Sequence, residues 1–235
     1  MLVEGAGLSH SEFLRYVLDT LGVDCQAIFT TPLADDQRYI FASNHPFGGL
    51  DGMMIINELQ KRWGDAGAIV NDLLMAVEPL SPFWVPVNKF GRQKNTTFQA
   101  YDAALSSPTK QILTFPAGFC SRVIDGKVQD TEWKSHFIKD AVRYNRQIVP
   151  VYVEGQLSKR FYNIYRFRQF FNIKVNLELV LLVDEMFRQK GKRVRIVFGA
   201  PIDVNSLEGT AAEKTLKLRE ESYKLQQLLS NENDN

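Results

Sequence analysis

Residues Ser43–Gly52 have the sequence SNHPFGGLDG and separate two apolar runs. The run before this segment, YIFA at 39–42, is typical of a buried strand, and the run after it, MMIINEL at 53–59, has the pattern of a helix. Two adjacent glycines let the backbone turn sharply and let a ligand approach closely. The segment therefore predicts a strand–turn–helix unit, with His45 where the strand ends and Asp51 where the helix begins.

His45 and Asp51 have side chains suited to general-base catalysis. Histidine has an unperturbed pKa near neutrality, and a carboxylate at its second ring nitrogen fixes the tautomer and stabilises the imidazolium. The pair lacks a nucleophile of its own, and Ser43 is a poor candidate because side chains alternate along a strand. We therefore expect the pair to deprotonate a substrate hydroxyl or amine that attacks an activated acyl carbon. A purely structural His–Asp contact is the alternative.

Composition places the chain among ordinary globular proteins. It has 235 residues, of which 45% are hydrophobic and 23% charged, and a net charge of +1, which gives no indication of nucleic-acid binding. The charge is unevenly distributed. Residues 1–60 carry two basic against eight acidic side chains, and residues 155–200 carry ten basic against three acidic ones. We therefore expect a basic face on the later half of the chain.

The cysteines and histidines exclude a common metal site. Cys25 and Cys120 are far apart, and the chain has only three histidines, so we expect no metal, no bound cofactor and reduced thiols. The first residues lack the basic region of a signal peptide, and no run of about 18 apolar residues predicts a transmembrane helix. These observations predict a cytoplasmic protein whose contact with a membrane is peripheral.

Strand-like and helix-like segments alternate along the chain. This predicts an α/β fold, in which helices cover both faces of a mostly parallel sheet. We expect one domain over 1–230, with its core at about 36–202, and a disordered tail at 231–235. Expected strands are 38–43, 68–70, 111–115, 148–153 and 194–198, with 83–87 as an edge strand or loop; expected helices are 9–21, 51–63, 71–78, 95–106, 131–143, 157–171, 176–189 and 210–229.

Ligands in such folds bind beyond the carboxyl ends of the strands, where three further segments fall. FPAGFCSR at 115–122 has a turn whose backbone N–H groups, with Arg122, suit an anion or oxyanion, although an ordinary turn is the alternative. NKFGR at 88–92 has two cations that suit a phosphate or are simply solvated. VPVYVEG at 149–155 is expected to close a pocket wall.

Together and in this order, the four segments resemble the motifs of the glycerolipid acyltransferase family: Asn-His-x4-Asp, a basic block, Phe-Pro-Glu-Gly-Thr-Arg-Ser and Val-Pro-Val. The resemblance covers roughly 36–202. It implies that His45, oriented by Asp51, activates a lysolipid hydroxyl for attack on an acyl thioester of acyl carrier protein or CoA. The substrate contacts that it implies are Asn44, Lys89, Arg92, Phe115, Pro116, Gly118, Ser121 and Arg122.

Departures from these motifs indicate a subgroup. Five residues rather than four separate the histidine and aspartate, and the third block has Ala117, Phe119 and Cys120 where the family usually has Glu, Thr and Arg. That block holds glycerol phosphate in the family, so its loss of charge argues against a lysophosphatidate acceptor. With residues 130–133 and Phe137, the chain is more similar to a bacterial, hemolysin-like subgroup that resembles the O-acyltransferases of ornithine and glycine lipid synthesis. This resemblance implies a lyso-aminolipid acceptor. A 1-acylglycerol-3-phosphate acyltransferase, a thioester hydrolase and a non-catalytic peripheral lipid-binding protein are the alternatives.

Residues 158–174 interleave aromatic and basic side chains. On an interfacial helix the aromatic rings enter the headgroup region, and each cation near anionic lipid adds about 1 kcal/mol. The alternative is that the rings pack on the sheet and the cations are solvated. No nucleic-acid-binding motif is present. We predict contact with the anionic inner face of the cell membrane through Arg160, Phe161, Arg166, Phe167, Arg168 and Phe170.

Overall fold

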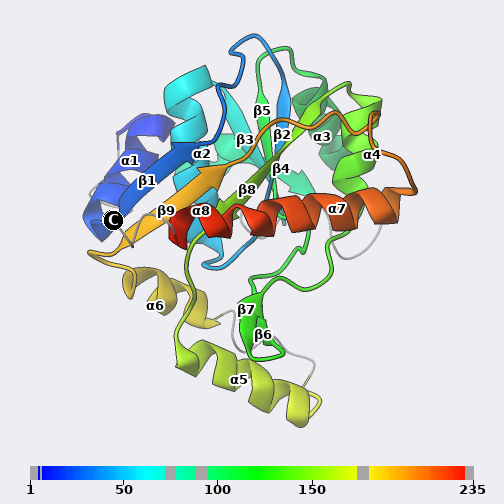
Figure 1. Ribbon diagram of the computed structural model, residues 1–235. Coiled ribbons are helices and arrows are strands. Elements are labelled where there is room, and N and C mark those ends of the chain that lie inside the picture. Colours follow the sequence, from blue (N-terminus) through cyan, green and yellow to red (C-terminus); the bar gives the residue numbers. More distant parts are fainter. Residues whose placement is uncertain (1–4, 6, 72–77, 88–94, 174–179, 231–235) are drawn as a thin grey trace.

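The computed structural model describes residues 5, 7–71, 78–87, 95–173 and 180–230, and its centre is one seven-stranded sheet (Figure 1). The strands lie in the order β1-β9-β8-β2-β5-β3-β4. Neighbouring strands are parallel except for β8 and β9, which are antiparallel. The predicted fold class is therefore confirmed. The strands are β1 (Asp24–Phe29), β2 (Tyr39–Ser43), β3 (Ala66–Asn71), β4 (Trp84–Val87), β5 (Gln111–Thr114), β8 (Gln147–Val153) and β9 (Arg193–Phe198).

Helices cover both faces of this sheet. One hydrophobic cluster joins α1 and α2 to one face, and a second joins α3, α4 and α7 to the other. β2 is buried throughout, with Tyr39 and Phe41 in the first cluster and Ile40 and Ala42 in the second, as the alternation of a strand requires. The helices are α1 (His10–Leu21), α2 (Gly49–Trp63), α3 (Asn95–Ser106), α4 (His136–Arg143), α5 (Lys159–Phe170), α6 (Leu182–Phe187), α7 (Ala211–Lys224) and α8 (Gln226–Ser230).

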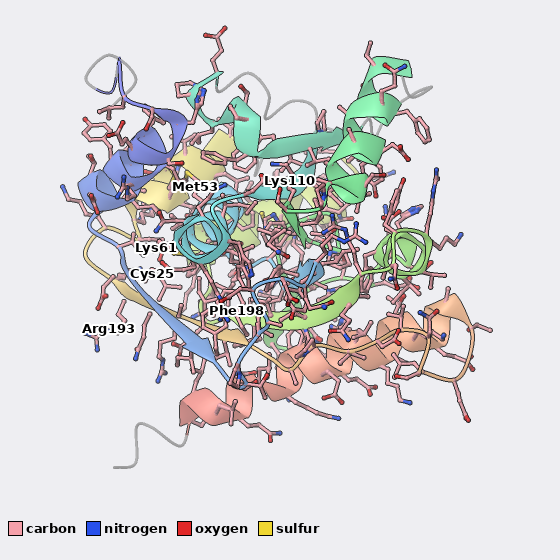
Figure 2. All side chains as sticks on the ribbon, turned by 90° about the horizontal axis from the view of Figure 1, so that it is seen from above. Cys25, Met53, Lys61, Lys110, Arg193 and Phe198 are labelled. Atoms are coloured by element: carbon pink, nitrogen blue, oxygen red, sulfur yellow. The ribbon has the colours of Figure 1, made fainter. Side chains whose placement is uncertain are left out.

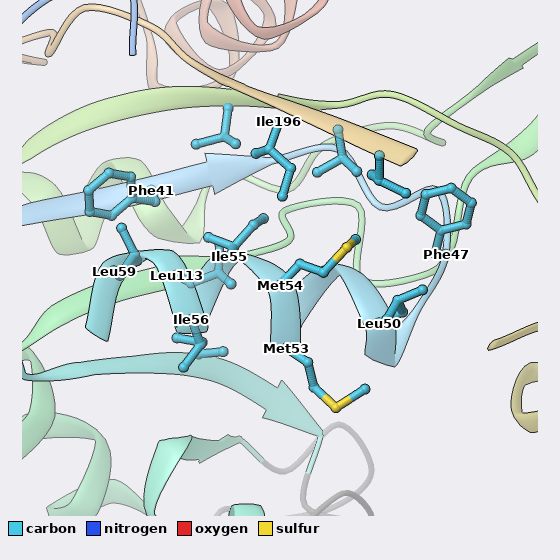
Figure 3. Close-up of a cluster of buried hydrophobic side chains, with 14 of the residues drawn as sticks. Phe41, Phe47, Leu50, Met53, Met54, Ile55, Ile56, Leu59, Leu113 and Ile196 are labelled. Atoms are coloured by element: carbon cyan, nitrogen blue, oxygen red, sulfur yellow. The ribbon is translucent and has the colours of Figure 1, made fainter. Parts of the chain in front are cut away.

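The helix α2 packs its apolar side chains directly on the central strands. Figure 3 shows Met54 and Ile55 between the helix and the sheet, with Phe47 and Leu50 at the end of α2 nearest the turn that precedes it. The view from above shows that Lys61 of α2 lies beside Cys25 of β1 (Figure 2). Because this helix is anchored along its length, the turn at its N-terminus has a fixed position.

Three elements lie away from the sheet at its carboxyl edge: α5, α6 and the hairpin of β6 (Arg122–Ile124) and β7 (Lys127–Gln129), all at the bottom of Figure 1. The hairpin and β1 were not predicted from the sequence. The hairpin turn is formed by Asp125 and Gly126, which have φ values of 50° and 76°. Asp-Gly suits this turn because both positions need left-handed backbone.

Several predicted helices differ in extent. α4 begins at His136 rather than at 131, because the N–H of Lys134 donates to the carbonyl of Pro116 at 3.0 Å and holds the preceding segment outside the helix. The predicted helix 210–229 is divided into α7 and α8. Residues 78–83 form a 3₁₀ helix, and 84–87 are an edge strand. The predicted helices 71–78 and 176–189 lie partly outside the described residues, at 72–77 and 176–179. The predicted tail 231–235 lies wholly outside them.

Candidate active site

His45 follows β2, and Asp51 lies in the first turn of α2. The turn between them brings Nδ1 of His45 to 2.9 Å from Oδ2 of Asp51. The same carboxylate oxygen accepts the backbone N–H groups of Phe47 at 2.9 Å and Gly48 at 3.0 Å. Gly48 has a φ of 77°, which favours glycine. The turn and the helix N-terminus therefore fix the carboxylate beside the imidazole, as the sequence predicted.

The two side chains of this pair differ in exposure. Asp51 is completely buried, whereas the side chain of His45 is 16% exposed. Burial raises the pKa of Asp51, and the contacts with His45 and with the N–H of Phe47 oppose this rise because they stabilise the carboxylate. Of the two side chains, only the imidazole is therefore accessible to a substrate, and the carboxylate of Asp51 contacts the histidine from the buried side.

Phe115 stacks on the imidazole of His45. The ring centroids are 3.9 Å apart and the rings are inclined by 28°. Phe115 follows β5, which is the parallel neighbour of β2, so the residues after the two strand ends meet as predicted. The N–H of Gly118 donates to the carbonyl of Phe115 at 2.9 Å, so it closes the turn at Pro116 and is not available to an oxyanion. The contact of Gly118 with a substrate stays a prediction.

The loop after this turn returns to His45. The N–H of Ser121 donates to the carbonyl of His45 at 2.7 Å. The side chains of Ser121 and Arg122 are both buried. Nη1 of Arg122 donates to the carbonyls of Cys120 at 2.7 Å and Ser121 at 3.3 Å, and the guanidinium lies over two aromatic rings of α5. The structure thus brings both residues to the site, and their contact with a substrate stays a prediction.

Asn44 does not face this site. Its Nδ2 donates to the carbonyl of Val153 at 2.9 Å, and its Oδ1 accepts the N–H of Val153 at 2.7 Å. The side chain is buried and joins the ends of β2 and β8, so the predicted substrate contact is wrong. Gly155, which follows β8, leaves room for the ring of Phe47 in the turn between His45 and Asp51. A Cβ on Gly155 would lie only 2.0 Å from Cζ of Phe47.

The two cysteines are buried or partly buried thiols. The sulfur of Cys120 would lie 3.1 Å from a Cβ built on Gly48, so it packs against the turn between His45 and Asp51. Burial raises the pKa of Cys120 to about 12 and that of Cys25 to about 12. Both thiols are therefore protonated at neutral pH, and neither is a candidate nucleophile.

Asp130 is a residue of the site that the sequence analysis did not identify. It follows β7 and is 1% exposed, and its Oδ1 accepts the backbone N–H of His45 at 3.1 Å and the hydroxyl of Ser121 at 2.6 Å. In the sequence, residues 130–133 supported only the resemblance to the subgroup, and no spacing connects Asp130 to His45. Within the described ranges, no group of three or more His, Cys, Asp or Glu side chains is arranged to hold a metal. Lys89 and Arg92, the predicted phosphate ligands, lie outside the described residues.

The predicted membrane contacts on α5 lie on two faces. Phe170 is 84% exposed, and Phe167, Arg160 and Arg166 are also exposed. Arg168 is half-buried and donates to the carbonyl of Ile173 at 3.3 Å. Phe161 is fully buried, with the guanidinium of Arg122 over its ring, so the prediction that it contacts lipid is wrong.

In the described parts of the chain, every helix is too short or too polar to cross a bilayer.

Comparisons with known proteins agree on one family. The acyltransferase family model matches residues 4–232. A lyso-glycine lipid O-acyltransferase of Bacteroides thetaiotaomicron is 36% identical over 192 residues, which are 81% of this chain and 70% of that protein. One of Phocaeicola vulgatus, with the same name, is 33% identical over 200 residues, or 85% and 71%. The fold is similar to that of a 1-acyl-sn-glycerophosphate acyltransferase of Thermotoga maritima, with a TM-score of 0.55, 15% identity and coverage of 90% and 76%.

Proposed function

This chain belongs to the acyltransferase family, and on that premise we propose that it moves a fatty acyl group from a thioester to the hydroxyl of a lyso-aminolipid of the glycine or ornithine type. Family membership and the two relatives confirm the resemblance inferred from the motifs, and the chain is a lysolipid acyltransferase. The observation that carries the proposed transfer mechanism is the 2.9 Å contact between His45 and Asp51 at the carboxyl edge of the sheet.

The proposed reaction is direct transfer with His45 as the general base. The imidazole takes the proton of the lysolipid hydroxyl while Asp51, at Nδ1, stabilises the imidazolium that forms. The hydroxyl oxygen forms the new ester bond to the acyl carbon, and the carbon–sulfur bond breaks. The carrier's sulfur leaves as a thiolate, which takes the proton from the imidazolium of His45 and becomes a thiol. The donor is an acyl carrier protein or CoA thioester, and the mechanism uses neither a metal nor a covalent acyl-enzyme.

The acceptor proposal rests on the third motif and on the relatives. The names of both relatives give lyso-glycine lipid as their substrate. In this chain Ala117 and Cys120 replace the charged residues of the family motif, and both are buried, so neither offers a charge to a phosphate monoester. Arg122, although largely buried, is the motif's remaining cation. A headgroup with a single carboxylate needs fewer charge-assisted bonds than a phosphate monoester.

We expect lyso-glycine or lyso-ornithine lipid to be a better acceptor than lysophosphatidate, by about tenfold or more in kcat/KM, because a missing charge-assisted bond weakens binding by roughly 1.5–3 kcal/mol. The measurement is a side-by-side transfer assay with one acyl thioester and each acceptor. A preference for lysophosphatidate would contradict the proposal and favour the common activity of the family. Thioester turnover that is equally fast without any lysolipid would indicate a hydrolase instead.

We also propose that the enzyme contacts the anionic inner face of the cell membrane through a lipid-facing surface. We define this surface as the exposed apolar side chains of α5 and α6 and the residues next to them, namely Phe167, Phe170, Phe171, Val180, Val183 and Phe187. The rings of Phe167 and Phe170 each contact that of Phe171, and Arg166, next to Phe167 in the sequence, is exposed. An ion pair of 3.2 Å between Arg160 and Asp184 joins the two helices. Both helices lie at the same edge of the sheet as the proposed base (Figure 1).

The double variant Arg166→Glu/Phe170→Ser should lower binding to anionic vesicles by about tenfold or more. Each cation contributes about 1 kcal/mol near anionic lipid, and a buried phenylalanine contributes about 1.5–3 kcal/mol. Cosedimentation with vesicles measures the bound fraction. The matched control is Lys217→Glu/Leu216→Ser on α7, where both side chains are exposed away from this surface. Equal loss of binding in the two double variants would show that the surface has no special role.

A further inference from the structure

We propose that Asp130 is a positioning residue for the catalytic base, which it holds through the main chain of His45. This inference rests on the proposed function, because it takes His45 to be the base. It adds a second carboxylate that is close to the base but separate from the His45–Asp51 pair. The argument starts from the hydrogen bonds of Asp130 and follows them to the imidazole.

The carboxylate of Asp130 accepts hydrogen bonds from three parts of the chain. Oδ1 accepts the N–H of His45 at 3.1 Å and the hydroxyl of Ser121 at 2.6 Å. Oδ2 accepts the indole N–H of Trp133 at 2.8 Å. All three hydrogen bonds go to a carboxylate that is 1% exposed. They hold the side chain in one orientation, away from solvent.

These bonds hold the main chain of His45 on both sides of its Cα. Its N–H donates to Asp130, and its carbonyl accepts the N–H of Ser121 at 2.7 Å. Since the hydroxyl of Ser121 also donates to Asp130, the three residues form a closed ring of hydrogen bonds. The ring fixes the direction in which the His45 side chain leaves the strand. That direction places the imidazole between Asp51 and Phe115.

Asp130 is itself held by the helix α7. Its N–H donates to the hydroxyl of Tyr223 at 2.7 Å, and its carbonyl accepts Nη2 of Arg219 at 3.1 Å. Figure 1 shows α7 crossing the sheet above the hairpin that precedes Asp130. The position of His45 therefore depends on a helix that contributes no side chain to the proposed chemistry. We expect Asp130 to affect the rate by positioning His45 and by placing a negative charge near its imidazole.

The negative charge of Asp130 also lies close to the imidazole, where it adds to that of Asp51. Burial raises the pKa of Asp130, and the hydrogen bonds from Ser121 and Trp133 oppose this rise. A nearby negative charge stabilises an imidazolium, which is the form that His45 takes during the proposed transfer. Other titratable or charged groups around this cluster are Asp51, Cys120, Arg122, Tyr152, Arg219 and Tyr223.

The test is Asp130→Asn in the full chain. The asparagine amide keeps one oxygen that accepts hydrogen bonds. Its NH₂ group faces a donor, such as the indole N–H of Trp133, which then has no acceptor. We expect kcat to fall by about 10- to 100-fold with KM for the acyl thioester within about twofold, as for a displaced catalytic group. We also expect the acid limb of the kcat/KM–pH profile to move to lower pH. Asp140→Asn is the matched control, because that half-buried carboxylate of α4 bonds to Tyr101 and is not in contact with His45.

Rescue separates geometry from general destabilisation. Trp133→Phe removes the donor that would face the new NH₂, so Asp130→Asn/Trp133→Phe should recover part of the lost kcat but keep the shifted acid limb. If Asp130→Asn does not fold, as judged by circular dichroism, Ser121→Ala replaces it. That variant opens the ring with the charge retained, so kcat should fall by about three- to tenfold without a shift of the acid limb.

Wild-type kcat together with an unshifted acid limb in Asp130→Asn would overturn the inference, as would wild-type kcat in Ser121→Ala where that variant is the one tested. If His45→Ala is inactive, neither of these results would contradict the proposed function. Conversely, an active His45→Ala protein would remove the proposed base itself, and Asp130 would have nothing to position. The two proposals can therefore fail separately.

Discussion

His45→Ala should lower acyl transfer by about three orders of magnitude or more while the protein keeps its fold, since a positioned general base contributes roughly 10²- to 10⁴-fold to rate. Its neighbour Asp51 cannot replace the imidazole. Asp51 is completely buried, so it cannot reach a substrate. Apart from its contacts with Phe115 and Asp51, the His45 ring lies outside the hydrophobic clusters, so its removal should leave the packing of β2 and α2 unchanged. We therefore expect a variant that melts like the wild type but does not transfer acyl groups.

The measurement is transfer of a labelled acyl group from thioester to lysolipid, with a thermal melt of each protein. His136→Ala is the matched control, because His136 is an exposed histidine at the start of α4. It should retain wild-type activity. Transfer at the wild-type rate by purified His45→Ala protein would exclude the general-base mechanism, even if the family assignment stood.

Asp51→Asn should reduce kcat by an amount on the order of 10²- to 10⁴-fold, because an amide neither fixes the tautomer of His45 nor stabilises its imidazolium. The substitution keeps the shape of the side chain and one oxygen for the N–H groups of Phe47 and Gly48. The turn should therefore persist. Steady-state kinetics with saturating acyl thioester measure the loss, and Asp140→Asn again serves as the control for replacing a half-buried carboxylate.

The raised pKa of Asp51 lets stability and activity be separated in the same variant. A carboxyl group whose pKa is raised by folding destabilises the native state above the pKa of the unfolded chain, because the folded protein binds the proton more tightly. The Asn variant lacks this penalty, so at neutral pH it should melt at or above the wild-type temperature. A variant that lost activity only because it unfolded would melt lower, which would contradict the assigned role.

The sequence predicts the turn between His45 and Asp51 because the signals in that segment are local. The apolar run, the glycine pair and the helical pattern are contiguous, and the ends of parallel strands meet at one edge, so the approach of Phe115 to His45 also follows. The strand β1 gave no such signal, because it is an edge strand with no fully buried position. The hairpin does have a local signal in Asp125-Gly126, a dipeptide typical of a two-residue turn.

The rest of the site depends on contacts that no sequence pattern records. Asp130 bonds to His45 and Tyr223, which are 85 and 93 residues away along the chain. The pattern of α5 likewise alternates rings and cations without showing which ring faces inward, and Phe161 turned out to be buried under Arg122. Asn44 lies in the motif but serves the strand ends. Proximity in a motif therefore did not distinguish a chemical role from a supporting one.

The buried thiols have a practical consequence for anyone who follows this reaction. Each proposed turnover releases the carrier's thiol, which a coloured disulfide reagent can count continuously. The enzyme has two cysteines, and the pKa of each is raised to about 12. At pH 7.5 the reactive thiolate is then a fraction on the order of 10⁻⁴ or less of each cysteine. The protein itself should therefore contribute almost no background colour, and the reagent should not inactivate the enzyme during the assay.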